Sequence, residues 1–133
     1  MGKASEFQAP DLLETGILDR AAEDWGWKDQ ATRNQAIKWY EAFLHVVYNN
    51  PGGRNVLITR EADELWHTHI TFTVKYRQYC EAILGFYLDH TPQERGYKTR
   101  ATAQDVKVAK QAYKAVTDDW PDIKAEMVAI VCW

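Results

Sequence analysis

Apolar residues recur every three or four positions along most of the chain, and turn residues divide this pattern into helix-length pieces. The first predicted helix starts at a capping-box sequence, Asp11 with Glu14, and ends at Gly26. The clearest helix runs from about Asp29 to Asn49, where asparagine, proline and glycine residues follow. The pattern therefore predicts two helices in the first part of the chain.

The helical periodicity resumes after a short apolar run at 56–58, which is predicted as a strand or an extended lead-in. Thr59 is the expected N-cap of the next helix, whose pattern extends to Gly85. A second capping sequence, Thr102 to Asp105, opens a helix that is predicted to end near Trp120-Pro121.

Residues 89–100 are predicted as a loop, and the tail from Asp122 to Trp133 as a final helix, although 128–133 are also compatible with a strand. The pattern contains no series of alternating strands. The expected fold is therefore all-α, a compact bundle of about five to six helices that forms a single domain over residues 1–133.

Composition agrees with a globular chain. At 133 residues it has the size of one domain and buries roughly two-thirds of its unfolded surface, so folding requires no disulfide or metal. Six Trp, seven Tyr and four Phe indicate a core built largely of rings, several with a polar group that requires a partner. Cys80 and Cys132 lack metal-site spacing and are expected to be buried hydrophobes.

Charge and hydropathy limit the classes of partner that the protein is expected to bind. The net charge of -3 argues against nucleic-acid binding, because neutralising phosphates requires a basic face. No segment has the length of a signal-peptide core or of a membrane span. We expect a soluble, cytoplasmic protein without a nucleic-acid or membrane partner, and the sequence identifies neither a small-molecule nor a protein partner.

Metal-type ligands concentrate in one stretch that contains Asp63 and His67. These residues are four apart, so on a helix their side chains lie on one face about a turn apart, as in helices that offer two ligands to one metal. His69 points about 200° away from His67 on a straight helix, which predicts a core histidine. His45 lies opposite the apolar face of its own helix and is expected to be solvated.

His90 can join the site only if the helix before it is broken. In one straight helix His67 and Gly85 would be about 27 Å apart, a distance that five more residues could not recover. The β-branched cluster from Ile70 to Val74 contains two threonines that could cap a new helix. We expect a turn there, which would bring His90 towards Asp63 and His67 and release His69 from the helical-angle argument.

Over about Ala36 to Pro121 the chain resembles the glycine-rich domain-containing protein-like family, whose bacterial members are often small single domains. In many relatives two adjacent histidines follow the glycine, whereas here Asp89 replaces the first and His90 remains. The resemblance implies a shared site more than an activity. It rests on Asp63, Trp66-His67-x-His69, Tyr76, Cys80, Gly85, His90, Tyr113 and Trp120-Pro121.

Two hypotheses follow from these residues. The first is a small metal-binding protein, in one form a metal-dependent enzyme of unspecified reaction, that uses Asp63, His67 and His90, with His69 as a supporting hydrogen-bond partner or fourth ligand. Two imidazoles and a carboxylate suit zinc, iron, copper or manganese, and spacing does not select among these metals. The second is a metal-free helical interaction module with structural histidines and Asp63 and His67 as a surface hydrogen-bonded pair.

Other candidate residues are assigned no catalytic role. Glu64 does not match the His-Glu-x-x-His pattern of metallopeptidases, and its position predicts the polar side of the helix with Thr68. Cys80 has no base beside it in sequence, so we expect no nucleophilic role. Trp66, Tyr76 and a nearby tyrosine, Tyr79, line a pocket or belong to ordinary core.

Overall fold

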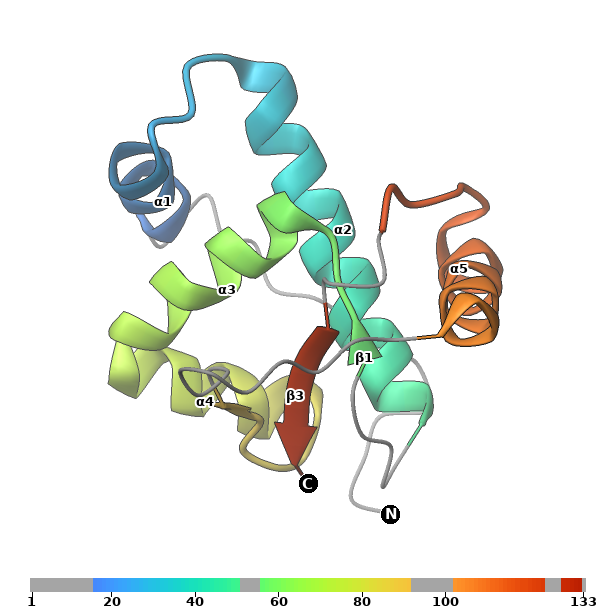
Figure 1. The fold of residues 1–133 in the computed structure, drawn as a ribbon. Coiled ribbons are helices and arrows are strands. Elements are labelled where there is room, and N and C mark those ends of the chain that lie inside the picture. Colours follow the sequence, from blue (N-terminus) through green and yellow to red (C-terminus); the bar gives the residue numbers. More distant parts are fainter. Residues whose placement is uncertain (1–15, 51–55, 92–101, 124–127, 133) are drawn as a thin grey trace, which may run out of the picture.

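The computed structural model describes residues 16–50, 56–91, 102–123 and 128–132, and the predicted all-α fold is confirmed there. Five helices form the body, and three short strands are added to it (Figure 1). The elements in chain order are α1 (Ile17–Trp25), α2 (Gln30–Asn49), β1 (Val56–Leu57), α3 (Arg60–Thr71), α4 (Thr73–Ile83), β2 (Asp89–Thr91), α5 (Ala103–Thr117) and β3 (Val128–Cys132).

Glycines bound helix α1 on both sides. Gly16 precedes it with a φ of 76°, a left-handed conformation that interrupts a helix and that side chains with a Cβ rarely adopt. The predicted helix therefore does not run unbroken from the Asp11 capping box, which lies outside the described residues. Gly26, with a φ of 70°, ends α1 where the sequence predicted, and its N–H donates to the carbonyl of Ala22.

Helix α2 is confirmed and provides the centre of the core. Its N-cap Asp29 accepts a hydrogen bond from the backbone N–H of Thr32 at 2.8 Å. One face of α2 is fully buried, as the periodicity predicted. Among its least exposed residues are Ala36, Tyr40, Phe43, Leu44 and Val47.

The helix break between Ile70 and Val74 is confirmed. Helix α3 starts after Thr59, whose hydroxyl oxygen accepts from the N–H of Ala62, and ends at Phe72, whose ψ of 67° departs from helical geometry. Phe72 is also the N-cap of α4, so neither threonine caps the new helix. The hydroxyl of Thr71 instead donates to the carbonyl of Thr68 at 2.6 Å within the last turn of α3.

The predicted capping box of α5 is confirmed. The side chain of Thr102 accepts from the N–H of Asp105, whose carboxylate accepts from the N–H of Thr102. The helix ends at Thr117, before the predicted Trp120-Pro121, because Asp118 adopts a φ of 62° and its N–H closes the last turn.

The expected helix in the tail is wrong over 128–132, where β3 forms the central strand of an antiparallel sheet in the order β1-β3-β2. Val56 pairs with Ala129, and His90 pairs with Val131, so the end of the predicted 89–100 loop nearest α4 is also a strand. Strands as short as β1 and β2 are stable only when a further strand satisfies their backbone groups. The β-branched residues of β3 suit that position.

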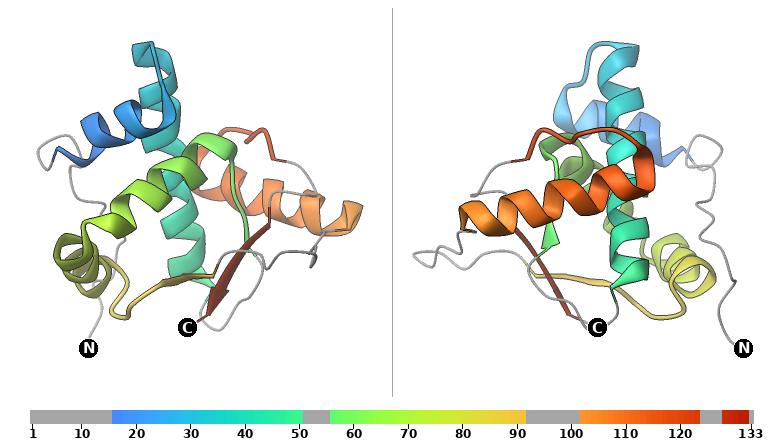
Figure 2. Two further views of the ribbon diagram at one scale, coloured as in Figure 1. Left: turned by 60° about the vertical axis from the view of Figure 1, so that its left-hand side comes forward. Right: turned by 90° about the vertical axis from the view of Figure 1, so that its right-hand side faces the viewer.

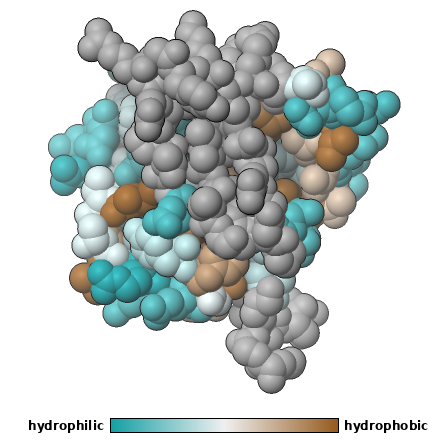
Figure 3. Space-filling view, turned by 60° about the horizontal axis from the view of Figure 1, so that its bottom comes forward, coloured by the Kyte–Doolittle hydropathy of each residue, from teal (hydrophilic) through white to brown (hydrophobic). Residues whose placement is uncertain are grey.

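Helix α2 lies between α3 on one side and α5 on the other, and α1 packs against α3 (Figures 1 and 2). The hydroxyl of Tyr113 on α5 donates to the carbonyl of Leu57 in β1 at 2.7 Å, which connects α5 to the sheet. No helix of the described residues has the length and apolar character needed to cross a membrane. The coloured surface in Figure 3 is mainly hydrophilic with separate hydrophobic patches.

Candidate functional site

The face of α3 that carries Asp63 and His67 is partly open to solvent. The side chains are 36% and 42% exposed, respectively. Nδ1 of His67 lies 2.8 Å from the backbone carbonyl of Asp63 and 3.6 Å from its carboxylate oxygen Oδ2. A carbonyl oxygen only accepts hydrogen bonds, so this geometry places a proton on Nδ1 and the lone pair of the neutral imidazole on Nε2. Asp63 therefore orients the His67 ring.

Helix α1 is fastened to this part of α3 through Thr68. The indole N–H of Trp25 donates to the Thr68 hydroxyl at 3.0 Å, and that hydroxyl donates to the Asp24 carboxylate at 3.2 Å. The ring of Trp25 also lies against the imidazole of His67, with centroids 5.9 Å apart. Trp25 is thus the neighbour of His67 on α1.

Glu64 and Thr68 make polar contacts, as their predicted place on the polar side of the helix implies, but this side is covered by α1 and the segment after it. Thr68 is 2% exposed and the Glu64 side chain is 16% exposed, because Trp25 and Trp27 cover this side of α3. The indole N–H of Trp27 donates to one carboxylate oxygen of Glu64 at 2.9 Å, and Arg60 pairs with the other at 3.4 Å. Both Glu64 oxygens are therefore engaged in contacts within the protein.

A cleft of about 380 Å³ opens beside these contacts, within the size range of small-molecule sites. It lies between the α1–α2 connection and the first turns of α2 and α3. Its walls combine indole rings with charged and amide groups, among them Trp25, Trp27, Gln35, Arg60, Glu61 and Glu64. Trp25 borders both the cleft and His67.

His69 lies in the protein core, as its helical angle predicted. Its side chain is 1% exposed, and its Nδ1 is 2.6 Å from the hydroxyl of Tyr40 on α2. Burial disfavours the charged imidazolium and lowers the pKa of His69 to about 4. Because His67 faces Trp25 of α1 and His69 faces Tyr40 of α2, the two histidines lie on opposite sides of α3.

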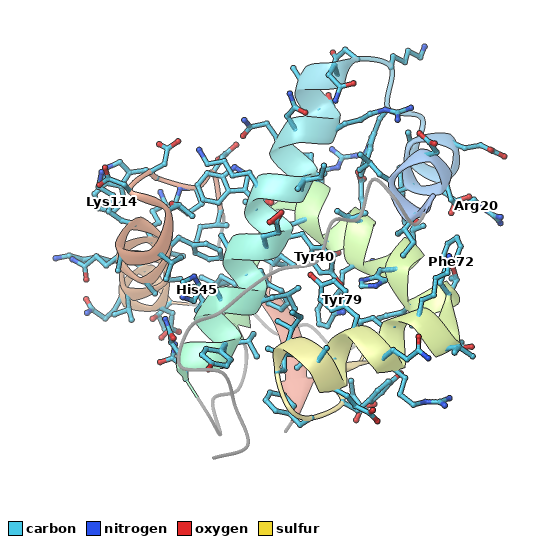
Figure 4. The ribbon with its side chains drawn as sticks, turned by 180° about the vertical axis from the view of Figure 1, so that it is seen from behind. Arg20, Tyr40, His45, Phe72, Tyr79 and Lys114 are labelled. Carbon is cyan, nitrogen blue, oxygen red and sulfur yellow. The ribbon has the colours of Figure 1, made fainter. Side chains whose placement is uncertain are left out.

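Three tyrosine rings stand nearly perpendicular to the imidazole of His69. Its centroid is 5.6 Å from that of Tyr40, 5.0 Å from Tyr76 and 4.6 Å from Tyr79. Figure 4 shows Tyr40 and Tyr79 in the interior between α2 and α4. Nε2 of His69 and the hydroxyl of Tyr79 are both buried without a hydrogen-bond partner among the described residues.

Trp66 and Tyr76 belong to the core. Both are fully buried, and the indole N–H of Trp66 donates to the Tyr76 hydroxyl at 2.9 Å. That hydroxyl donates in turn to the carbonyl of Leu88 at 2.5 Å, which fixes the chain just before β2. Cys80 is a buried free thiol, as predicted, and burial raises its pKa.

His90 and His45 are the other two histidines of the chain. The backbone of His90 lies in β2, but its side chain lies outside what the structure describes, so its convergence with Asp63 and His67 stays a prediction. His45 is half-buried rather than solvated, and this burial lowers its pKa. Within the described residues, no three His, Cys, Asp or Glu side chains form a group that could hold a metal ion.

The sequence did not reveal the partners of α3 on its neighbouring helices. Sequence reasoning gives neither Tyr40 nor Trp27 a role beyond the core. The signal for both was the high aromatic content, since buried tyrosine and tryptophan need partners for their polar atoms. Identifying those partners required the packing of separate helices.

A family model described as UCP032817-like matches residues 6–122. The comparisons with curated proteins and with solved structures gave no match.

Proposed function

The chain belongs to the UCP032817-like family, and on this premise we propose that it binds a divalent transition metal through His67, whose ring Asp63 orients. The orientation of the imidazole carries the proposal. Metal-ligating histidines commonly donate their second ring N–H to a carbonyl or carboxylate, which fixes the tautomer and the ring direction. In His67 the Nδ1 contact with the backbone carbonyl of Asp63 is of this kind, which supports Nε2 as the coordinating atom.

The sequence predicts Asp63 as a direct metal ligand. In this proposal Asp63 instead orients the ligand His67. His90 is the second protein ligand in this proposal, on the basis of the sequence. An imidazole site of this type suits zinc, iron, copper or manganese. A site with few protein ligands leaves coordination positions for water or substrate, as catalytic metal sites do.

The cleft beside Trp25 supports a ligand next to such a metal. Trp25 lines the cleft and lies against the ring of His67, so the cleft and the proposed metal site share one side chain. The same cleft favours the alternative function, a metal-free interaction module, because Trp25 is 42% exposed beside it. Metal content distinguishes the two functions.

The test is elemental analysis of purified, tag-free protein, with titration of zinc and manganese into chelator-treated protein. Wild-type protein is expected to bind one metal per chain, and His67→Ala is expected to lose it. His45→Ala is the matched control, because His45 lies on α2 and Figure 4 places it towards α5. Absence of bound metal in the wild-type protein, or equal binding by both variants, would contradict the metal proposal and leave the interaction module.

Cytoplasmic location is part of the proposal, as is the resemblance to the glycine-rich domain-containing protein-like family. That resemblance supports a shared site at the D-x-x-W-H-x-H segment rather than a particular reaction.

A further inference from the structure

Two buried polar atoms in the core require an explanation that the metal proposal does not provide. Nε2 of His69 and the hydroxyl of Tyr79 have no hydrogen-bond partner among the described residues, although the two residues are only 1% and 7% exposed. Their rings are in edge contact, with centroids 4.6 Å apart. Buried polar groups are nearly always hydrogen-bonded, and such exceptions point to a bound water, an ion or a functional group.

The hydrogen bond to Tyr40 determines what Nε2 can bind. A phenol is a stronger acid than a neutral imidazole N–H, so the Tyr40 hydroxyl donates to Nδ1 across the 2.6 Å contact. The imidazole proton is then on Nε2, which becomes a hydrogen-bond donor. The Tyr79 hydroxyl is a second donor on the adjacent ring. Because the two donors are on rings in edge contact, a single acceptor atom is the smallest partner that could satisfy both.

We propose that His69 Nε2 and the Tyr79 hydroxyl together bind one oxygen atom of a small uncharged molecule. A carbonyl or water oxygen has two lone pairs and can accept both hydrogen bonds. The inference is independent of the proposed metal site, which lies on the opposite side of α3.

The surroundings exclude charged ligands. An anion would lose its hydration among buried rings and would be repelled by Glu41, whose charge adds to burial in raising the pKa of Tyr79. A metal ion would need several coordinating groups, and no three His, Cys, Asp or Glu side chains in the described part of the chain surround such a point. A neutral oxygen acceptor is the ligand class that remains.

The direction in which Tyr79→Phe changes the equilibrium constant of unfolding tests whether an acceptor oxygen is bound. If an oxygen occupies the site, Tyr79→Phe removes a made hydrogen bond and raises the equilibrium constant of unfolding about fivefold. If the site is empty, Tyr79→Phe removes a buried unsatisfied group and leaves that constant unchanged or lower. Tyr113→Phe is the matched control, because the Tyr113 hydroxyl is buried and already donates to Leu57, so its loss raises the constant in either case.

Nuclear magnetic resonance of the unmodified protein identifies the oxygen and does not depend on folding of a variant. Nuclear Overhauser effects from water to the His69 ring would identify a bound water. Shifts of the His69 Nε2–H resonance on titration of acetamide, absent in Tyr79→Phe, would identify a carbonyl ligand. Either result supports the proposal. The proposal would be overturned if the His69 proton is on Nδ1 or if an oxygen of the protein itself accepts from Nε2. It would also be overturned if neither resonance signal is seen and Tyr79→Phe leaves the equilibrium constant of unfolding unchanged.

Discussion

The hydroxyl of Tyr40 and Nδ1 of His69 lie 2.6 Å apart in the centre of the protein and join α2 to α3. Both side chains are at most 1% exposed. Bulk solvent does not reach either partner, so the hydrogen bond contributes to stability mainly by avoiding an unpaired polar group. Its contribution to stability can be measured by substituting Tyr40 or His69.

Removing the Tyr40 hydroxyl should destabilise the fold. Tyr40→Phe retains the ring but leaves Nδ1 of His69 unpaired, which is expected to lower the free energy of unfolding by about 1 to 3 kcal/mol in urea titrations. Tyr87→Phe is the control, since Tyr87 is 45% exposed and its substitution should change stability by less than about 0.5 kcal/mol. Equal effects of the two variants would show that the Tyr40–His69 bond does not contribute.

Stability should fall in acid because of His69. Its pKa is about 4 in the folded state and about 6.5 when unfolded, so below pH 6.5 the unfolded chain binds a proton that the folded protein does not. The free energy of unfolding should decrease between pH 6.5 and 4, by up to roughly 3 kcal/mol, and this contribution should be constant above pH 7. Urea unfolding at several pH values should show a smaller decrease for His69→Gln, and an unchanged pH dependence in that variant would contradict the assignment.

Truncation of the two histidines of α3 should have different effects in metal-free protein. His69→Ala opens a cavity and leaves Tyr40 unpaired, with an expected loss of about 2 to 4 kcal/mol. His67→Ala should cost less than about 1 kcal/mol, because His67 is 42% exposed. Denaturant unfolding in the presence of a chelator measures both, and a larger loss for His67→Ala would reverse the assignment of core and surface roles.

The metal proposal predicts that a substitution of Asp63 and a decrease in pH each weaken metal binding. Asp63→Asn keeps the backbone carbonyl that accepts from Nδ1 and removes only the charge of the carboxylate 3.6 Å away, so it should weaken metal binding by less than about tenfold. Binding should also weaken as pH falls through the histidine range, because a protonated imidazole cannot coordinate. Calorimetric titration of zinc at pH 7.5 and 5.5 measures both changes. Loss of binding in Asp63→Asn as complete as in His67→Ala would show that the Asp63 carboxylate is a direct ligand, and equal affinity at both pH values would contradict coordination by His67.

The contact between α1 and α3 depends on the buried hydroxyl of Thr68. Thr68→Val preserves the side-chain shape but leaves the indole N–H of Trp25 without its acceptor, with an expected loss of about 1 to 2 kcal/mol. Thr73→Val on the exposed side of α4 is the matched control and should be nearly neutral. The indole N–H resonance of Trp25 should shift in Thr68→Val alone, and an unchanged resonance would show that this hydrogen bond does not form.

The sequence by itself determined the local features of the fold. The start of α2 near Asp29, the N-cap Thr59, the Thr102–Asp105 capping box and the stop at Gly26 were all predicted correctly, as was the break before α4. Each depends on hydrogen bonds or backbone conformations within about four residues, so the residues that specify the feature are adjacent in the chain. The burial of His69 followed in the same way from its angle on α3.

Only the tertiary structure decided which groups meet across the helices. The tail could form a helix or a strand by its own pattern, and pairing with β1 and β2 made 128–132 a strand. The Tyr40–His69 and Trp27–Glu64 bonds join residues 29 and 37 positions apart, respectively. Local periodicity shows that such side chains are buried or exposed, but their partners are fixed only when separate helices pack together, because the free energy of these contacts is gained after the intervening chain has been ordered.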